Sequence, residues 1–373
     1  MNEPFPALPP RVCFVAAPLM ARTGVYRSVH ELVAEARSRG LEWSGVLGIR
    51  PGAPGGVVTP GVSEATVLRH GPAVLDEVRD LVLDSPAVAA SDVVVTLVTQ
   101  SDVALARLRR SRRAPVDTWH AWVRGLPWPA PGEQAAWRRA VLRRLESGAL
   151  RAADEVWATT PVLADEIARV RRPELVRAGV KLGARTVTGD RFDELVWAGR
   201  FDVEKRPHAF VDLVEACGVR GRLHGVGPLE QGLRSRAGAG AGVRVMGWTD
   251  PHELHRTGDV FVGTAYREAF GRSAAEAAAS GLPLVLGDRY GAAPTLITDD
   301  ELRRRFVLPV DEPAAWVRAV RDLAADDGLR RAHSDHVAAA ARAASIAASV
   351  DAVLERVGGG AGPAATSSVR SGA

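Results

Sequence analysis

The chain has 373 residues, enough for two domains of ordinary size, and its 46% hydrophobic and 25% charged content excludes a disordered or fibrous protein. The net charge of +4 is too mild to indicate a nucleic-acid partner. No apolar run is long enough to cross a bilayer and the N-terminus lacks the pattern of a secretion signal, so we expect a cytoplasmic protein. Cys13 and Cys217 lack the spacing of a disulfide framework or a zinc site and are expected in the core.

Short apolar runs alternate with helix-length segments along the chain, which is typical of parallel α/β units. The strands expected in the first half are Val12–Ala16, Ser44–Ile49, Val93–Val98, Val116–Trp119, Glu155–Ala158 and Leu175–Val180. The helices expected between them are Val25–Ser38, Ala73–Leu83, Val103–Arg110, Gln134–Ala152 and Val162–Val170. We expect these elements to form one Rossmann-like domain over residues 1–185.

A second alternating set follows the polar stretch Arg185–Asp190, which we interpret as the domain linker. Its expected strands are Glu194–Ala198, Arg222–His224, Val243–Met246, Val260–Gly263, Leu284–Leu286 and Phe306–Leu308. Its expected helices are Ala209–Ala216, Leu229–Arg236, Ser273–Ser280 and Ala314–Ala325. This set predicts a second Rossmann-like domain over residues 186–340, then a helix at 341–357 with the option of crossing back to the first domain, and a disordered tail at 358–373.

Arginine is concentrated between Ser101 and Arg151, where 11 arginines stand against 4 acidic residues. The clusters are Arg107–Arg113 and the helical stretch Arg138–Arg144. Such faces are commonly just solvated, but a basic amphipathic face also suits an anionic membrane surface. Four tryptophans of the same region could stack on a sugar-like acceptor or simply fill the core: Trp119, Trp122, Trp128 and Trp137.

The stretch Trp197-Ala-Gly-Arg-Phe-Asp-Val-Glu-Lys-Arg-Pro207 carries the clearest chemical signal. Gly199 permits a tight turn where the strand ends, and Arg200 and Lys205 follow in the loop. The chain has only two lysines against 46 arginines, so a lysine here is informative. A guanidinium and an ammonium can clamp a diphosphate and stabilise it as a leaving group without a metal. The alternative is two solvated cations on a surface loop.

A second motif lies in Tyr266–Pro283, where a helix is expected to begin near Gly271 and end at Gly281. The first backbone amides of that helix would offer an anion site. Glu268 precedes the helix and could reach sugar hydroxyls, whereas Glu276 lies inside it and could accept hydrogen bonds from a ribose. Either glutamate alone would be an ordinary surface or helix-end carboxylate.

Gly-Arg-x5-Lys followed by Glu-x7-Glu and Gly-Leu-Pro resembles the large retaining GT-B family of bacterial mannosyl- and N-acetylglucosaminyltransferases, the family 4 type also called glycosyl transferases group 1. The resemblance runs through most of 194–290, including Gly225-Val-Gly227-Pro228. It implies Arg200 and Lys205 on the diphosphate, Glu268 on the donor sugar and Glu276 on the ribose. It also implies donor contacts from six residues around these motifs: Gly199, Gly225, Phe270, Gly271, Arg272 and Ser273.

The first half resembles the family less closely. Gly24 is a single glycine where the family has a Gly-rich turn, and it could present its amide to the donor. His120, expected at the end of a strand, falls where the family often carries a cleft histidine that orients the sugar; a structural histidine is the alternative. The family's Asn-Gly-Val segment has become Arg177-Ala-Gly179-Val180, so we assign no contacts to it.

The sequence therefore predicts a metal-independent, retaining glycosyltransferase of the hexosyltransferase class, with no cofactor and with a nucleoside-diphosphate sugar as donor. UDP-sugars are the default because they are common in the resembled family. We expect a small-molecule acceptor, such as a secondary metabolite. A peripheral membrane enzyme with a lipid or cell-envelope acceptor is the alternative not favoured, and a non-catalytic sugar-nucleotide-binding protein is a third. The oligomeric state is not predicted.

Overall fold

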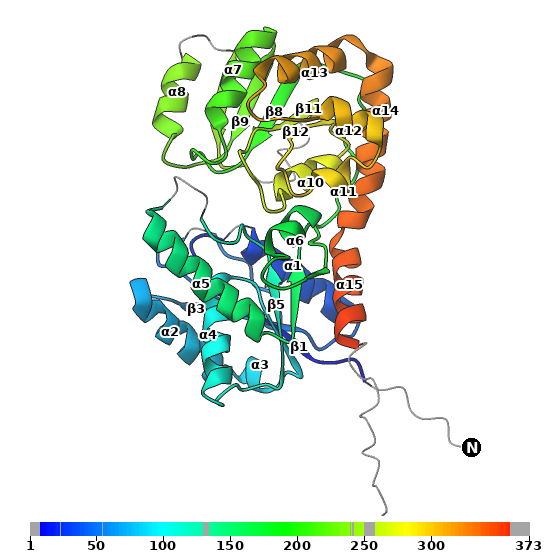
Figure 1. Cartoon of the computed structure of the whole chain (residues 1–373). Helices are drawn as coiled ribbons and strands as arrows, with labels where there is room; N and C mark the ends of the chain where they lie inside the picture. Colours follow the sequence, from blue (N-terminus) through cyan, green and yellow to red (C-terminus); the bar gives the residue numbers. More distant parts are fainter. Residues whose placement is uncertain are drawn as a thin grey trace, which may run out of the picture.

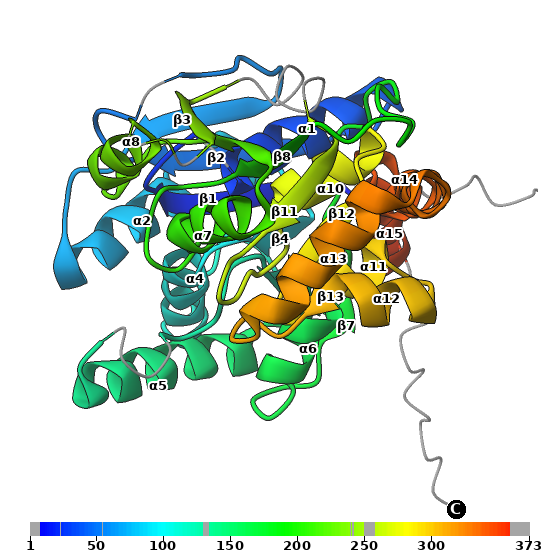
Figure 2. The same ribbon diagram turned by 90° about the horizontal axis from the view of Figure 1, so that it is seen from above.

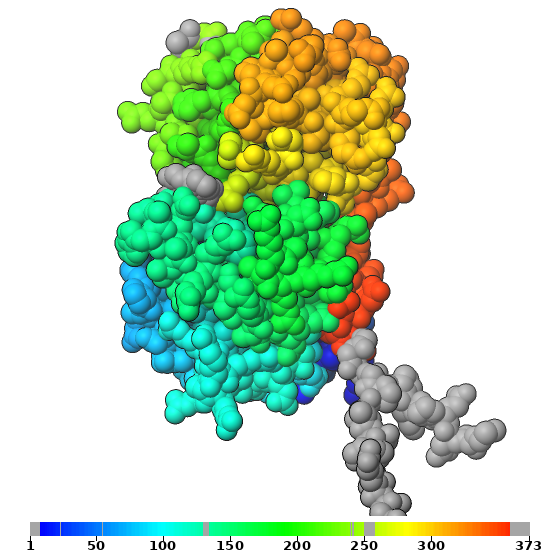
Figure 3. Space-filling model, in the orientation of Figure 1, coloured from blue at the N-terminus to red at the C-terminus, as the bar shows by residue number. Residues whose placement is uncertain are grey.

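The computed structural model of the chain describes residues 8–22, 24–53, 55–129, 134–238, 240, 242–249 and 258–358. Two open sheets, one of seven strands and one of six, are built from parallel strands throughout. Each sheet is covered by helices, and the two layered units stand one above the other in Figures 1 and 3. The fold class is the predicted one, two Rossmann-like units facing each other.

The first sheet has the strand order β3-β2-β1-β4-β5-β6-β7, so the order reverses between β1 and β4. Its strands are β1 (Val12–Leu19), β2 (Ser44–Ile49), β3 (Val62–Thr66), β4 (Val93–Thr96), β5 (Thr118–Val123), β6 (Glu155–Ala158) and β7 (Glu174–Leu175). Its helices are α1 (Val25–Ser38), α2 (Val74–Leu83), α3 (Pro86–Ala89), α4 (Thr99–Arg110), α5 (Ala136–Ala152) and α6 (Pro161–Ile167), with a 3-10 turn η1 (Gly71–Ala73). Buried apolar side chains fill both faces of the sheet, as parallel sheets require.

The second sheet has the order β10-β9-β8-β11-β12-β13, with its reversal between β8 and β11. Its strands are β8 (Glu194–Ala198), β9 (Arg220–His224), β10 (Val243–Gly247), β11 (Val260–Gly263), β12 (Leu284–Gly287) and β13 (Val307–Leu308). Its helices are α7 (Pro207–Cys217), α8 (Glu230–Gly238), α10 (Arg272–Ala279), α11 (Ala293–Leu296), α12 (Asp300–Phe306) and α13 (Pro313–Ala325). A single apolar core joins this sheet to its helices.

The C-terminal segment connects the two units. After α14 (Asp327–Ala340) and the 3-10 turn η2 (Ala341–Ala344), helix α15 (Ile346–Gly358) descends along the first unit, as Figures 1 and 2 show. Val350 and Val353 are fully buried in the core of that unit, where α15 packs against α1. The predicted option of a crossing back is confirmed. The tail predicted to be disordered lies outside the described residues from 359 onward.

Several expected elements differ from the structure, each for a physical reason. Edge strand β3 was not predicted, because its sequence VSEAT is largely exposed and has no apolar run. The expected strand Leu175–Val180 is only two residues long, although Val176, Ala178 and Val180 are buried in the segment that follows it. The short helices α3, α11 and α12 were missed as well. Cys13 is buried as expected, whereas Cys217 is only partly buried.

Candidate functional site

A cavity of about 410 Å³ lies between the carboxyl ends of the two sheets, the edge at which open parallel sheets bind ligands. The loop after β1 and the start of α1 form one wall, and the loops after β8, β9 and β10 with the start of α10 form the other. Its lining residues are Ala21, Gly24, Arg27, Ala198, Gly199, Arg200, His224, Gly225, Val226, Gly227, Trp248, Thr249, Arg272, Ser273 and Glu276. Seven predicted donor-site residues are therefore brought together: Gly24, Gly199, Arg200, Gly225, Arg272, Ser273 and Glu276.

Close backbone approach shapes the wall formed by β8 and β9. Gly225 has φ +149°, and a Cβ there would lie 1.8 Å from the carbonyl oxygen of Gly199, so only glycine fits. The Gly199 amide donates to the His224 carbonyl at 3.0 Å, which fixes the turn. Arg200 then extends into solvent, 67% exposed, with its Nε 2.5 Å from Asp202 Oδ2. Its guanidinium is positioned at the cavity mouth but not buried there.

Lys205 and Glu268, predicted as separate contacts, form an ion pair. Lys205 Nζ lies 2.5 Å from Glu268 Oε2, and both side chains are about four-fifths buried, at 22% and 19% exposed. Asp202 Oδ1 accepts a hydrogen bond from the Lys205 amide at 3.0 Å, so the same aspartate organises both ends of the loop. Neither member of the pair lines the 410 Å³ cavity. A ligand that uses both groups would have to insert between them or share the ammonium.

Helix α10 begins at Arg272 with its amino end toward the cavity. Gly271 caps it at φ +89°, and a Cβ there would collide with the Tyr290 ring at 1.8 Å, which explains the glycine. Ser273 lines the cavity and donates its hydroxyl to the Ala198 carbonyl at 3.1 Å, which joins α10 to β8. Phe270 packs partly buried against the core rather than in the cavity. The helix amino end is therefore the anion-attracting wall of the site.

Glu276 is held by two arginines from different units. Its Oε1 lies 2.9 Å from Arg272 Nε and 3.1 Å from Arg27 Nη2 of α1. Arg272 also contacts Glu31 of α1. Although burial opposes its charge, Glu276 and Glu31 hold the pKa of Arg272 above its usual value. The floor of the cavity is a charged network that spans both units, and Arg27 and Glu31 were not predicted from the sequence.

His224 and Trp248 are further cavity residues that the sequence analysis missed. His224 is 3% exposed, its Nδ1 lies 2.9 Å from Thr249 Oγ1, and Nε2 has no hydrogen-bond partner among the described residues. Burial, with Arg222 nearby, lowers its pKa to about 4, so the ring is neutral at pH 7. Trp248 is 67% exposed. The available sequence signals were a histidine directly before Gly225-Val-Gly227-Pro228 and a tryptophan directly after the next strand.

His120 does not lie where the sequence placed it. Strand β5 runs to Val123 instead of ending at Trp119, so His120 is in mid-strand, 5% exposed and stacked on Trp157 at 4.8 Å between ring centroids. Burial lowers its pKa. It is not among the residues that line the 410 Å³ cavity. The predicted strand end at Trp119 is therefore wrong, and the interpretation as a structural histidine fits this position.

Arg124 occupies the strand end where a histidine was expected. It is 9% exposed, Nη2 donates to Ser28 Oγ at 2.8 Å, and Nη1 has no hydrogen-bond partner in the described part of the chain. Burial, and the charge of Arg272, lower its pKa to about 9. Arg124 lines a smaller cavity of about 160 Å³ at the point where the first sheet reverses its strand order. A basic residue following an apolar run was the only sequence signal.

Two buried acids share this smaller cavity. Asp102 receives the Thr96 hydroxyl at 2.5 Å, and Glu146 receives the Thr99 hydroxyl at 2.8 Å. Burial raises the pKa of Asp102 to about 7 and also raises that of Glu146. Ser28 joins this cavity to the larger one, because it receives hydrogen bonds from both Arg124 and Arg272. The two cavities are therefore neighbours along the same interface.

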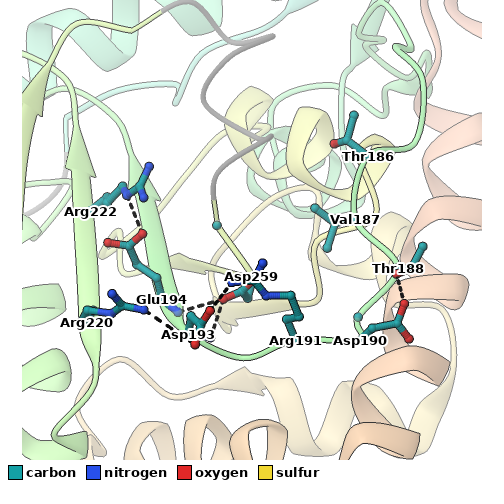
Figure 4. Close-up of a pocket in the computed structure, with 12 residues that line it drawn as sticks. Thr186, Val187, Thr188, Asp190, Arg191, Asp193, Glu194, Arg220, Arg222 and Asp259 are labelled. Atoms are coloured by element: carbon teal, nitrogen blue, oxygen red, sulfur yellow. Dashed lines mark hydrogen bonds and ion pairs between the residues drawn. The ribbon is translucent and has the colours of Figure 1, made fainter.

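Two other hollows lie elsewhere on the protein. One of about 910 Å³ lies between Trp128 and α5 of the first unit and the Tyr266–Arg267 loop of the second. Another of about 540 Å³, shown in Figure 4, lies at the amino ends of β8, β9 and β11. Its charges pair with one another, Arg222 with Glu194 at 2.5 Å and Arg220 with Asp193 at 3.7 Å. Because this hollow lies at the amino ends of the strands, and open parallel sheets bind ligands at the carboxyl ends, we do not assign a site there.

The architecture is similar to that of several solved structures. The chain superposes on sucrose-phosphate synthase from Thermosynechococcus elongatus with a TM-score of 0.75 at 18% identity, over 94% of this chain and 99% of that one. HepE from Anabaena, solved in complex with UDP-glucose, gives a TM-score of 0.70 at 15% identity over 94% of this chain and 100% of that one. The fold is therefore GT-B, the two-Rossmann architecture of glycosyltransferases.

Sequence comparison finds two similarities to glycosyltransferases. Residues 193–326 match the model of glycosyl transferases group 1. D-inositol 3-phosphate glycosyltransferase from Xylanimonas cellulosilytica is 31% identical over 200 residues, which are 50% of this chain and 44% of that relative. The chain thus spans less than half of the relative it matches. Over residues 193–326 the chain is therefore similar to the glycosyl transferases group 1 family, as its motifs indicated.

Neither a metal cluster nor a membrane span is seen in the described residues. No group of three or more His, Cys, Asp or Glu side chains there is arranged to hold a metal ion. No helix among them is both long enough and apolar enough to pass through a bilayer.

Proposed function

We propose that the chain transfers a sugar, with retention of configuration, from a nucleoside diphosphate, UDP by default, to an acceptor held against the first sheet. The observation that carries the proposal is the 410 Å³ cavity, which joins the Arg200 loop and the amino end of α10 to α1 of the other unit. The similarity of residues 193–326 to glycosyl transferases group 1 supports it, and so do the neighbours of the same fold that were solved with UDP or UDP-glucose.

In this proposal Arg200 and Lys205 stabilise the leaving diphosphate together with the amides of α10. Arg200 is free enough to turn from Asp202 to a phosphate, since two-thirds of its side chain is exposed. Glu268 would orient the donor sugar and Glu276 the ribose. The neutral His224 and the indole of Trp248 would contact the nucleobase, since His224 Nε2 is left without a partner among the described residues.

The acceptor would enter through the cavities that contain Arg124 and Trp128. Both of these cavities are lined by Leu126, and the smaller one adjoins the donor cavity through Ser28. A small polyhydroxylated acceptor could donate to Glu146 and Asp102 and accept from Arg124. In the transfer the bond from the sugar C1 to the phosphate oxygen breaks, C1 bonds to the acceptor oxygen, and the acceptor proton passes to the departing phosphate.

Calorimetric titration with UDP, GDP and ADP, together with a donor-hydrolysis assay, tests the proposal. We expect UDP to bind, Trp248→Ala and Glu276→Gln to weaken it by roughly tenfold or more, and UDP-sugar to be slowly hydrolysed. Val203→Ala, an exposed residue of the same loop as Arg200, is the matched control. If no nucleoside diphosphate binds below about 1 mM, the proposed function is wrong. Binding without any hydrolysis or transfer across acceptor pools would favour the non-catalytic alternative.

A further inference from the structure

The first half of α5 stands away from the body of the protein, as Figure 2 shows. From Ala136 to Leu145 its residues are exposed, except that Arg139 is half-buried. Four large apolar side chains are among them: Trp137 is 71% exposed, Val141 50%, Leu145 41% and Leu142 38%. Exposing this much apolar surface on one helix has a cost that a partner would remove.

Three of these four apolar residues face away from the side of the helix that packs on the molecule. Trp137, Val141 and Leu145 follow one another at intervals of four residues, so they line up within about 80° of the helix circumference. The residues with which α5 packs, Glu146, Ser147, Ala149 and Leu150, are centred on the opposite side of the helix. Those that line the 910 Å³ cavity, Ala136, Arg139, Ala140 and Arg143, overlap this packing side and are likewise turned away from the apolar residues. The apolar stripe is therefore needed neither by the fold nor by that cavity.

The stripe is bordered by positive charge only. At 100° per residue, Arg138 lies on one side of it and Arg144 on the other. No acidic residue occurs between Gln134 and Leu145. Arginines with long apolar stems on either side of a tryptophan can place their charges in a lipid headgroup layer while the indole reaches the acyl boundary.

We propose that the exposed face of α5, formed by Trp137, Val141 and Leu145 with Arg138 and Arg144, docks on an anionic lipid surface. The positive charge of Arg138 and Arg144 favours a negatively charged partner for this face. A second copy of the chain would bring the same arginines against one another, and like charges in contact oppose association. The surface lies outside the donor cavity, so the proposal is independent of the proposed function.

Vesicle co-sedimentation of the full chain without any substrate tests it. We expect binding to vesicles with 40% phosphatidylglycerol, weak or no binding to pure phosphatidylcholine, and loss of binding as salt rises, because each arginine near the surface contributes roughly a fivefold gain. Trp137→Ala should lower the partition coefficient by roughly tenfold, and Arg138→Gln with Arg144→Gln by roughly 20-fold or more. In wild type, Trp137 should account for a blue shift of fluorescence on binding.

Matched controls sit on the same unit. Arg107→Gln with Arg110→Gln removes two exposed charges from α4, and Leu83→Ser removes an exposed apolar side chain from α2. Neither should change partitioning by more than about twofold. Because all these side chains are exposed, the variants should keep the wild-type melting temperature. Equal binding to neutral and anionic vesicles, no binding to either, or a dimer in light scattering that Trp137→Ala dissolves would each overturn the proposal.

Discussion

Arg272 of α10 places its Nη2 2.5 Å from Oε1 and 2.7 Å from Oε2 of Glu31 in α1, across the interface between the two sheets. Both side chains are largely buried, at 12% and 16% exposed. The same guanidinium contacts Glu276, the predicted ribose ligand. The position of α10 over the donor cavity is thus tied to the first unit by a forked ion pair.

Replacing Glu31 tests how much this ion pair stabilises the arrangement. We expect Glu31→Gln to lower the free energy of unfolding by about 1–3 kcal/mol, because Arg272 keeps Glu276 but loses its second carboxylate in a desolvated place. Urea denaturation at pH 7.5 measures it. Glu35→Gln, one turn along α1, removes an exposed pair with Arg39 and should cost less than about 0.5 kcal/mol. If Glu31→Gln lowers the free energy of unfolding no more than Glu35→Gln does, the buried ion pair between the units does not stabilise the fold.

Removing the positive charge of Arg200 or Lys205 should slow turnover. Arg200→Ala and Lys205→Ala are each expected to lower kcat/KM by roughly two to three orders of magnitude, the usual loss when one charge-stabilising group is removed. Lys181→Ala, at the other lysine of the chain, is exposed and lies outside the cavity, and it should leave kinetics unchanged. Near-normal turnover by a folded Arg200 or Lys205 variant would remove that residue from the proposed site.

The second unit could be predicted from the sequence more closely than the first, and the reason is local. Around Gly199 and Gly271 the motifs coincide with strand ends and a helix start, so their residues fall at the sheet edge whatever the details of packing. The contacts between those residues were not predictable. The Lys205–Glu268 pair joins positions 63 residues apart, and only the folded chain shows that the two groups neutralise each other.

In the first unit a shift in one strand moved a predicted site residue. Val116–Trp119 looked like a complete strand because Trp119 is followed by a histidine, yet β5 continues through Trp122 and Val123. A residue in the middle of a strand points into one of the two packed faces of the sheet, whereas a residue just past the strand end lies at the sheet edge. Arg124 rather than His120 reaches the interface. The network of Arg27, Glu31 and Arg272 depends on how the two sheets face each other, which no local pattern records.

Metal removal tests the charge stabilisation by Arg200, Lys205 and α10. Turnover should survive exhaustive EDTA treatment, because in the proposal the two cations and the helix amides take the role that a divalent ion has in metal-dependent enzymes. The measurement compares initial rates before and after chelation, with dialysis to remove the chelator. Loss of turnover that returns on addition of Mn²⁺ or Mg²⁺ would assign the leaving-group charge to a metal instead.

His333 should make stability depend on pH. Its ring is fully buried in α14 against Phe306, at 4.5 Å between centroids, and within the described residues neither nitrogen has a hydrogen-bond partner. Burial, with His336 and Arg305 nearby, lowers its pKa to about 3. Below pH 6.5 the unfolded chain therefore binds a proton at this histidine that the folded chain does not bind. The free energy of unfolding consequently falls as the pH is lowered from about 6.5 toward 3.

His333→Leu removes both the unpaired nitrogens and that proton uptake. We expect a stability gain of about 1 kcal/mol at pH 7.5, from relief of the unpaired polar atoms, and a larger gain at pH 5. Urea unfolding at the two pH values measures the difference. His70→Leu, at an exposed loop position, is the control and should change stability by no more than about 0.5 kcal/mol. A gain that shrinks toward pH 5 would contradict the assignment.

Stereochemistry tests the proposed reaction most directly. An inverting transfer needs a base on the side of the acceptor, and His120, the histidine for which the sequence suggested a place in the cleft, is buried in mid-strand and stacked on Trp157. In a front-face retaining route the departing phosphate oxygen takes the acceptor's proton, so Arg200, Lys205 and α10 need only stabilise the diphosphate. Asp102, whose pKa is raised to about 7 by burial, is the residue that could still serve as a base. The anomeric coupling constant of fresh product, read by NMR, should match that of the donor. Inversion, abolished by Asp102→Asn, would replace the retaining mechanism with base catalysis from the first sheet.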